Sequence, residues 1–134
     1  MTTYLIVSFV GGLLFAGLDG VINANPLAVK LLRVYLPIAR TRVNMISGML
    51  IDLLYGYLLA LLFLLLYTSL PGESGLLKGI SFGLITWFLR VLMAVLGEWM
   101  MFTVPVKTLL YKLLAGLGEM LLLGILYGLT LKPF

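Results

Sequence analysis

The chain has 134 residues, of which 63% are hydrophobic and 10% are charged, and its formal net charge is +4. With a mean hydropathy of +1.20, its apolar runs are longer than those of soluble core helices, which excludes a soluble fold. The sequence contains no cysteine and no histidine. Disulfides, thiolate zinc sites, haem ligation by imidazole and iron–sulfur ligation by this chain alone are therefore excluded, and we expect no metal and no cofactor. The small basic excess forms no nucleic-acid patch, so nucleic acid is not an expected partner.

Four apolar runs have the length of about 20 residues that crossing a bilayer requires. They cover residues 4–24, 44–68, 79–104 and 108–131. No lysine or arginine precedes the first run and no small-residue cleavage site follows it, so we expect this span to be retained. The second and third connections are short, which predicts an all-α, up-down-up-down membrane four-helix bundle that forms a single domain over residues 1–134.

The first connection, residues 25–43, has the pattern of a short helix lying at the membrane surface. Asn25 can cap this helix and Pro26 can occupy its first position. Pro37 is expected to end it, and Tyr35 suits the level of the lipid headgroups. The other tyrosines and the two tryptophans lie mostly near the predicted interfaces, where aromatic belts would account for them.

Lysine and arginine are unevenly divided between the two sides of the predicted bundle. One side has Lys30, Arg33, Arg40, Arg42, Lys107 and Lys112, and the other has Lys78 and Lys132. Because cytoplasmic loops carry the basic excess, we expect both termini outside the cytoplasm of a prokaryotic cell, in whose cytoplasmic membrane the protein would lie. The preferred interpretation of the basic segment is a topology signal that contacts anionic lipid. The alternative is a docking site for a specific lipid or protein.

Besides Lys112 near the start of the last run, five ionisable residues fall inside the apolar runs: Asp19, Asp52, Arg90, Glu98 and Glu119. Charges in hydrocarbon are rare and costly, so these side chains must face one another, a cavity or a partner. Counting about 1.5 Å per residue from the predicted cytoplasmic boundary places Arg90 and Glu119 near the midplane, on adjacent spans. We expect them to form an ion pair.

The same count places Asp19, Asp52, Glu98 and Lys112 in one layer of the cytoplasmic half. Two interpretations stay open. These groups form internal bridges that fix the register of the helices, or the two acids in excess over Lys112 bind a proton, a cation or a cationic substrate. Small residues share a face with the charges, as Ala115 and Gly116 do in the last span, so the acids are expected to point into the bundle.

One stretch of the chain resembles a known group of proteins. It contains the pattern Leu70-Pro71-Gly72, Gly75, Lys78-Gly79, Phe82-Gly83-Leu84 and Trp87. This pattern is similar to a hairpin in small, uncharacterised bacterial four-span membrane proteins classed as domains of unknown function. The end of the chain, with Gly124 and Gly128, is similar in character to their last span. The resemblance implies a four-span fold and a membrane location, and it implies no activity.

Motifs that would indicate catalysis are missing from the sequence. Asp19 and Asp52 could act as a pair of carboxylates, but their flanking residues are generic, and no phosphate-binding loop or metal-ligand spacing is present. We therefore expect no enzyme, but a structural or accessory subunit of a larger membrane assembly, or a homo-oligomer. Its partners would be the bilayer, other subunits or copies of itself. The alternative is a small transporter or a proton or cation channel that uses the buried carboxylates.

Overall fold

The computed structural model of the chain describes residues 2–38 and 45–131. In these residues there are helices and connections but no strand, which confirms the all-α class. The elements in chain order are α1 (Thr2–Ala24), α2 (Pro26–Leu31), the 3₁₀ helix η1 (Leu32–Ile38), α3 (Met45–Leu66), the 3₁₀ turn η2 (Tyr67–Ser69), α4 (Gly75–Trp87), the π-helical turn η3 (Phe88–Leu92), α5 (Met93–Met101) and α6 (Val106–Thr130).

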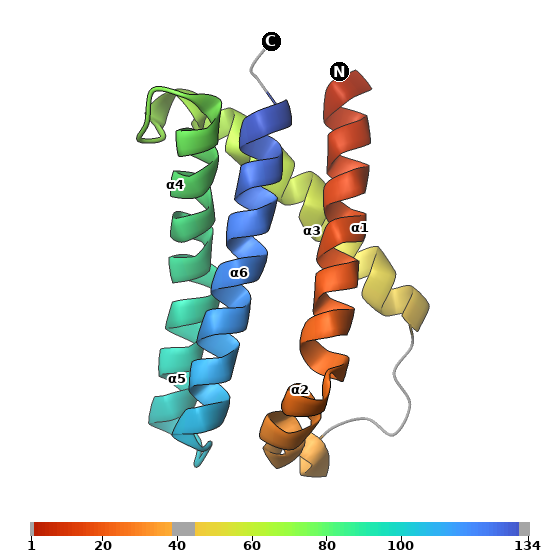
Figure 1. The fold of residues 1–134 in the computed structure, drawn as a ribbon, viewed down its shortest axis with the longest axis vertical. Coiled ribbons are helices and arrows are strands. Elements are labelled where there is room, and N and C mark those ends of the chain that lie inside the picture. The colour runs from red at the N-terminus through yellow and green to blue at the C-terminus, as the bar shows by residue number, and fades with distance from the viewer. Residues whose placement is uncertain (1, 39–44, 132–134) are drawn as a thin grey trace.

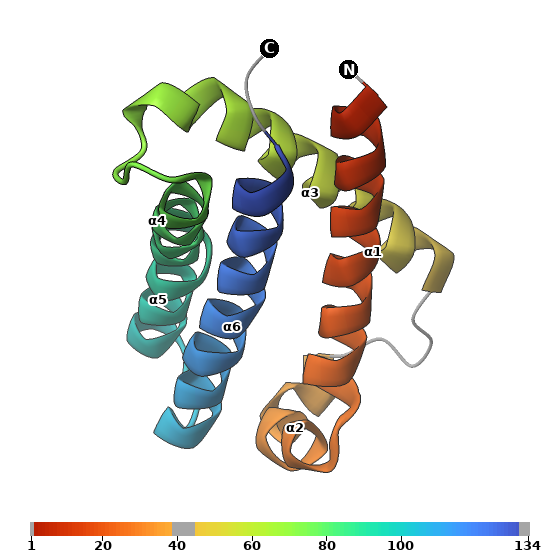
Figure 2. The same cartoon turned by 45° about the horizontal axis from the view of Figure 1, so that its top comes forward.

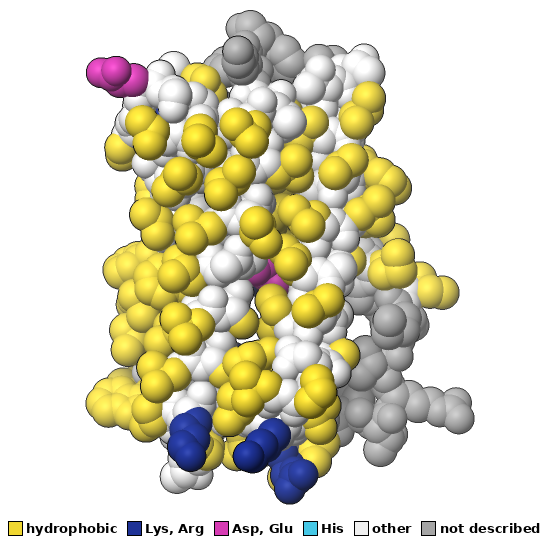
Figure 3. Space-filling model, viewed as in Figure 1, with side chains coloured by type: hydrophobic (Ala, Val, Ile, Leu, Met, Phe, Trp, Pro, Cys, Tyr) yellow, Lys and Arg dark blue, Asp and Glu magenta, His cyan; other side chains and the backbone are white. Residues whose placement is uncertain are grey.

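Four continuous helical stretches are long and apolar enough to cross a membrane, as the sequence predicts. They are Thr2–Ala24, Ile46–Ser69, Gly75–Met101 and Val106–Thr130. Apolar side chains cover most of the face seen in Figure 3, and basic side chains gather at its lower end. This distribution is consistent with an integral membrane protein.

The helices pack as two close pairs that meet along α6. One pair is α1 with α3, and the other is α4 with α6, while α1 also contacts α6. Figure 1 places the N-terminal end of α1 and the C-terminal end of α6 at the same end of the molecule. In both ribbon views α3 runs obliquely to α1, so the described helices depart from a regular parallel bundle (Figures 1 and 2).

Glycines bring α4 and α6 into backbone contact. A Cβ atom added at Gly79 would lie 2.2 Å from the carbonyl oxygen of Gly124, and one at Gly75 would lie 2.3 Å from that of Gly128. Neither position has room for a side chain. The glycine spacing in these two segments therefore fixes where the two helices touch, as small-residue stripes do in membranes.

The crossing of α1 and α3 also depends on glycine. A Cβ at Gly56 would lie 2.6 Å from the Cα of Gly12. The hydroxyl of Tyr127, on α6, donates a 2.8 Å hydrogen bond to the carbonyl oxygen of Gly56. The ring of Tyr127 is fully buried, against Phe63 and Phe82. The prediction of an interfacial aromatic belt is thus wrong for Tyr127, because its hydroxyl finds an acceptor inside the protein.

The first connection begins as predicted and ends differently. Asn25 caps α2 by accepting a 2.8 Å hydrogen bond from the backbone N–H of Ala28, and Pro26 follows it. The α-helix ends at Leu31, and the chain continues as the 3₁₀ helix η1 with Pro37 inside it. The prediction that one short helix runs on to Pro37 and ends there is therefore wrong. The predicted basic residues Arg40, Arg42 and Lys132 lie outside the described residues.

A tight turn joins α3 to α4 at the opposite end. Gly72 has a φ of +117°, a conformation that favours glycine. Ser74 caps α4 by accepting from the backbone N–H of Leu77. The ammonium group of Lys78 donates to the carbonyl oxygens of Tyr67 and Leu70, at 2.7 and 3.0 Å, and so binds the end of α3 to the start of α4.

Candidate functional site: a charged cavity beside α6

A cavity of about 640 Å³ lies between α1, η1, the η3–α5 segment and α6. Four of its lining side chains are charged: Asp19, Arg90, Lys112 and Glu119. The rest of the lining consists of Ile22, Asn23, Leu32, Tyr35, Tyr55, Val91, Ala94, Val95, Tyr111, Ala115 and Gly116. The cavity thus combines charges of both signs, phenol hydroxyls and apolar walls, a composition typical of binding sites for small molecules or ions.

Arg90 and Glu119 form an ion pair across the upper part of this cavity. The guanidinium Nη1 lies 3.4 Å from Oε1 of Glu119. The two partners are unequally covered, because the side chain of Arg90 is 33% exposed and that of Glu119 only 3%. The guanidinium also lies over the rings of Phe15 and Tyr55, 4.9 and 5.0 Å from their centroids. These rings hold the cation in place by cation–π attraction.

The π-helical turn determines where Arg90 points. Along this span the buried positions include Gly83 and Thr86, and the next is Val91, five residues further on. Val91 packs on α6, where a Cβ at Gly116 would meet it at 2.7 Å. Because the π turn adds one residue, Val91 contacts α6 while Arg90 reaches the cavity. Nothing in the sequence announces a π turn, which is often a feature of functional sites.

Three carboxyl groups from three helices meet next to Arg90. Asp19 on α1 interacts with Glu119 on α6 and with Asp52 on α3, and Arg90 acts on all three. The Oε2 atom of Glu119 is buried and has no hydrogen-bond donor among the described residues. One guanidinium therefore faces three acids, one of which has a buried oxygen without a donor.

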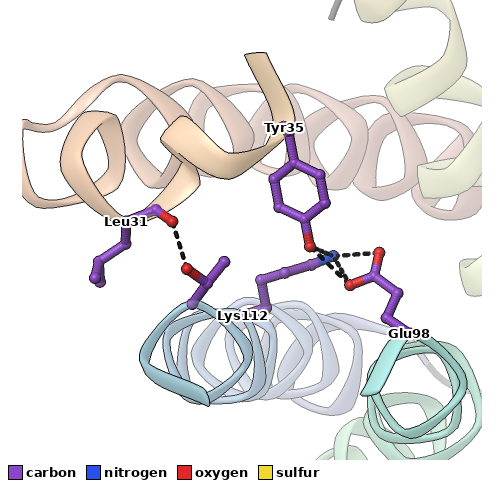
Figure 4. Close-up of polar contacts among 5 residues, drawn as sticks. Leu31, Tyr35, Glu98 and Lys112 are labelled. Atoms are coloured by element: carbon purple, nitrogen blue, oxygen red, sulfur yellow. Dashed lines mark hydrogen bonds and ion pairs between the residues drawn. The ribbon is translucent and has the colours of Figure 1, made fainter. Parts of the chain in front are cut away.

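A second charged group consists of Tyr35 and Lys112, which line the cavity, and Glu98, which contacts both of them. We call these three residues the polar latch. The ammonium of Lys112 lies 2.8 and 2.9 Å from the two carboxylate oxygens of Glu98. The hydroxyl of Tyr35 donates to Glu98 at 2.8 Å and accepts from Lys112 at 3.2 Å (Figure 4). Burial and the neighbouring carboxylate of Glu98 raise the pKa of Tyr35, so its hydroxyl remains a donor.

Further hydrogen bonds join the α2–η1 segment to α6. The hydroxyl of Thr108 donates to the carbonyl oxygen of Leu31 (Figure 4). The amide of Asn25 donates to the hydroxyl of Tyr111 at 2.9 Å, and that hydroxyl donates to the carbonyl oxygen of Ile22. The sequence assigned these tyrosines to the membrane interface and missed their inward bonds. For Tyr111, its position directly before Lys112 in the last span was the available signal.

The structure divides the predicted acidic layer into two groups. Glu98 and Lys112 belong to the polar latch, whereas Asp19 and Asp52 join the Arg90–Glu119 pair. Besides Lys112, the predicted basic residues that are described at this end are Lys30, Arg33 and Lys107, and all three are exposed. They lie outside the cavity lining.

Replacing Tyr35 with phenylalanine should loosen the α2–η1 segment. The change removes two hydrogen bonds of the polar latch and keeps the ring, over which Lys112 lies at 5.0 Å. We expect local opening to cost about 1 kcal/mol less, which makes opening about fivefold more frequent. The rate of hydrogen exchange at the backbone amides between Leu27 and Leu36 measures how often the segment opens. Tyr57→Phe is the control, because the hydroxyl of Tyr57 makes no hydrogen bond with the described residues. Equal exchange in both variants would mean that the latch does not hold the segment.

Comparison of the chain with protein-family models, with curated proteins and with solved structures finds no match. Within residues 2–38 and 45–131, no group of three or more histidine, cysteine, aspartate or glutamate side chains is placed to hold a metal ion. The charges and the shape of the cavity are therefore the features from which we infer a function.

Proposed function

We propose that the protein is a small membrane transporter or channel for a cation, and that the cavity beside α6 is its binding site. The observation that carries the proposal is the buried carboxyl of Glu119, which lines the cavity and whose Oε2 atom has no donor in the described part of the chain. A buried oxygen of this kind is costly unless a ligand or a proton satisfies it.

The balance of charge favours a cation as the ligand. Four acids lie in or next to the cavity, namely Asp19, Asp52, Glu98 and Glu119, and two bases, Arg90 and Lys112. The excess is therefore two negative charges. Ionisable groups within membrane spans commonly mark ion or proton pathways, which gives this excess a functional meaning.

The position of the cavity suits a transporter that opens toward the cytoplasm. The cavity is lined by Tyr35 and Lys112 of the polar latch, at the end of the molecule that carries the exposed Lys30 and Arg33. By the positive-inside rule this end faces the cytoplasm, and both termini lie on the other side. We propose that the protein has this orientation in a prokaryotic cytoplasmic membrane. We propose further that the chain is related to the small bacterial four-span membrane proteins that it resembles, and that it performs no catalysis.

A flux experiment with the purified protein in liposomes tests the proposal. Protons are followed with an entrapped pH-sensitive dye, and sodium and rubidium with radioactive tracers. The wild type should carry at least one of these ions, and Glu119→Gln and Asp19→Asn should each lower the flux at least about tenfold, which corresponds to about 1.4 kcal/mol in the barrier. Glu73→Gln, in the exposed loop after α3, is the control. Flux at the rate of empty liposomes, or flux that survives both changes, would contradict the proposal.

The second candidate function is that of an accessory or homo-oligomeric subunit. An open groove on α1 is lined by small residues, among them Ala16, Gly17, Gly20 and Ala24. A Cβ at Gly17 or Gly20 would meet nothing within 4 Å. Stripes of this kind accept a second helix in membranes, which favours a contact with another copy or another subunit.

Single-cysteine crosslinking tests this second candidate. Because the sequence contains no native cysteine, any disulfide between two chains must join the introduced residues. If α1 meets α1 of another copy, Gly17→Cys should form a disulfide-linked dimer in mild detergent. Gly118→Cys, at an equally open position on α6, should not. Native mass measurement of the wild type would detect other subunits that purify with it. Monomers alone in both measurements would count against the second candidate.

A further inference from the structure

The two carboxylate oxygens of Glu119 have different surroundings. Oε1 faces the guanidinium of Arg90 at 3.4 Å, whereas Oε2 is buried without a donor among the described residues. The neighbour that Glu119 meets on α1 is itself a carboxyl, that of Asp19. Two ionised carboxylates cannot satisfy each other, because both are acceptors only. With one proton between them, the same contact becomes an O–H···O hydrogen bond.

We propose that Asp19 and Glu119 form a proton-binding site: Asp19 carries the proton and donates it to Oε2 of Glu119, while Arg90 holds Oε1. Each oxygen of the buried carboxylate then has one donor. The inference rests on the proposed function, because it names the ion that the cavity binds. It assigns the proton to a contact between α1 and α6, two helices that both line the cavity.

The charged groups around the site agree with one bound proton. Asp52 faces Asp19 from α3, and Arg90 faces it from η3. On α6, Lys112 is engaged with Glu98 in the polar latch and gives no second cation to the pair. Three acids beside one guanidinium repel each other, and a proton on the central one, Asp19, removes its charge repulsion with both Asp52 and Glu119. The chain contains no histidine that could take this proton instead.

Amide substitutions separate the proton from the hydrogen bond. In Asp19→Asn the amide N–H supplies a permanent donor to Oε2 of Glu119, so the contact persists without a proton. In Glu119→Gln the amide donates to the carboxylate of Asp19 with the same result. Asp19→Leu, in contrast, removes the donor and leaves Oε2 buried and unsatisfied, which costs stability. We therefore expect Asp19→Asn to unfold at a higher denaturant concentration than Asp19→Leu.

Infrared spectroscopy of the protein in lipid vesicles detects a protonated carboxyl directly, through its C=O stretching band and the shift of that band in D₂O. The chain has five acidic side chains, so the band can be assigned by substitution. At neutral pH the wild type should show a protonated carboxyl that disappears in both Asp19→Asn and Glu119→Gln. It should persist in the loop control Glu73→Gln.

The outcomes separate the proton site from the transport proposal. A wild type without the band at neutral pH, or a band that is lost in Asp52→Asn and kept in Glu119→Gln, would overturn the proton site. Sodium or rubidium flux in the same vesicles would still support transport in that case. A band with the expected pattern supports the proton site, and if no ion crosses the membrane, the proposed function fails while the site remains.

Discussion

Changing Gly79 to alanine should separate α4 from α6 and cost about 3 kcal/mol or more of folding free energy, the upper part of the range for overpacked cores. The added methyl group would lie 2.2 Å from the carbonyl oxygen of Gly124 and 3.0 Å from the Cα of Gly128. These are backbone atoms, so no side chain can turn away to make room. The whole of one helix must shift, and the aligned contact between Gly75 and Gly128 is lost with it.

Gly97→Ala is the matched control, since Gly97 lies in the same continuous helix and an added Cβ there meets nothing within 4 Å. It should leave stability unchanged or raise it by up to about 1 kcal/mol, because alanine favours the helix. Reversible unfolding in mixed micelles, followed by tryptophan fluorescence, measures both variants. Trp87 is a suitable reporter, because its indole donates to the carbonyl oxygen of Leu113 at 2.9 Å and so joins α4 to α6. Similar losses in the two variants would show that the glycine contact does not determine the pairing.

Replacing Arg90 with methionine should produce the second large loss. The change keeps a flexible side chain of similar length but leaves Glu119, whose side chain is 3% exposed, without its cation. It also removes the cation from above Phe15 and Tyr55. Breaking a buried pair by removing one partner costs about 3–5 kcal/mol, and we expect about 3 kcal/mol because Arg90 itself is partly exposed. The measurement is the same unfolding titration.

A double variant distinguishes the loss of the ion pair from the loss of packing. Arg90→Met combined with Glu119→Gln leaves no uncompensated charge at this position. We expect it to be more stable than Arg90→Met alone, with a coupling energy of about 2 kcal/mol between the two sites. If the two single effects simply add, the stabilising role of Arg90 lies in its contacts with the rings and not in its charge.

Much of the fold follows from the sequence because the membrane restricts it. Long apolar runs can only be helices in lipid, and the cap at Asn25 and Pro26 is a local signal that tertiary contacts did not override. The oblique course of α3 could not be foreseen in the same way. It depends on the contact of Gly12 with Gly56 and on the bond of Tyr127 to Gly56, and the sequence does not say which glycine meets which.

From the sequence, the residues of the candidate site could be placed only by their depth in the predicted membrane. Counting along the helices placed Arg90 level with Glu119, and the structure sets them 3.4 Å apart. Depth counting placed Asp19 in the layer of Lys112, whereas in the structure it interacts with Glu119, about two helical turns further along α6. Tyr35 was read as an interfacial residue, because a tyrosine near a proline-terminated helix looks the same whether its hydroxyl meets a headgroup or Glu98.

The π-helical turn has a consequence for the whole third span. One extra residue in an α-helix changes the angular phase of everything beyond it by about 100°. Before the turn, Gly79 and Gly83 present bare backbone to α6. Within the turn Val91, and beyond it Val95, present side chains instead. A single unbroken helix thus combines two interfaces of different chemistry. Close contact at one end and a charged space at the other coexist without a kink-forming proline or a loop inside the described residues 75–101.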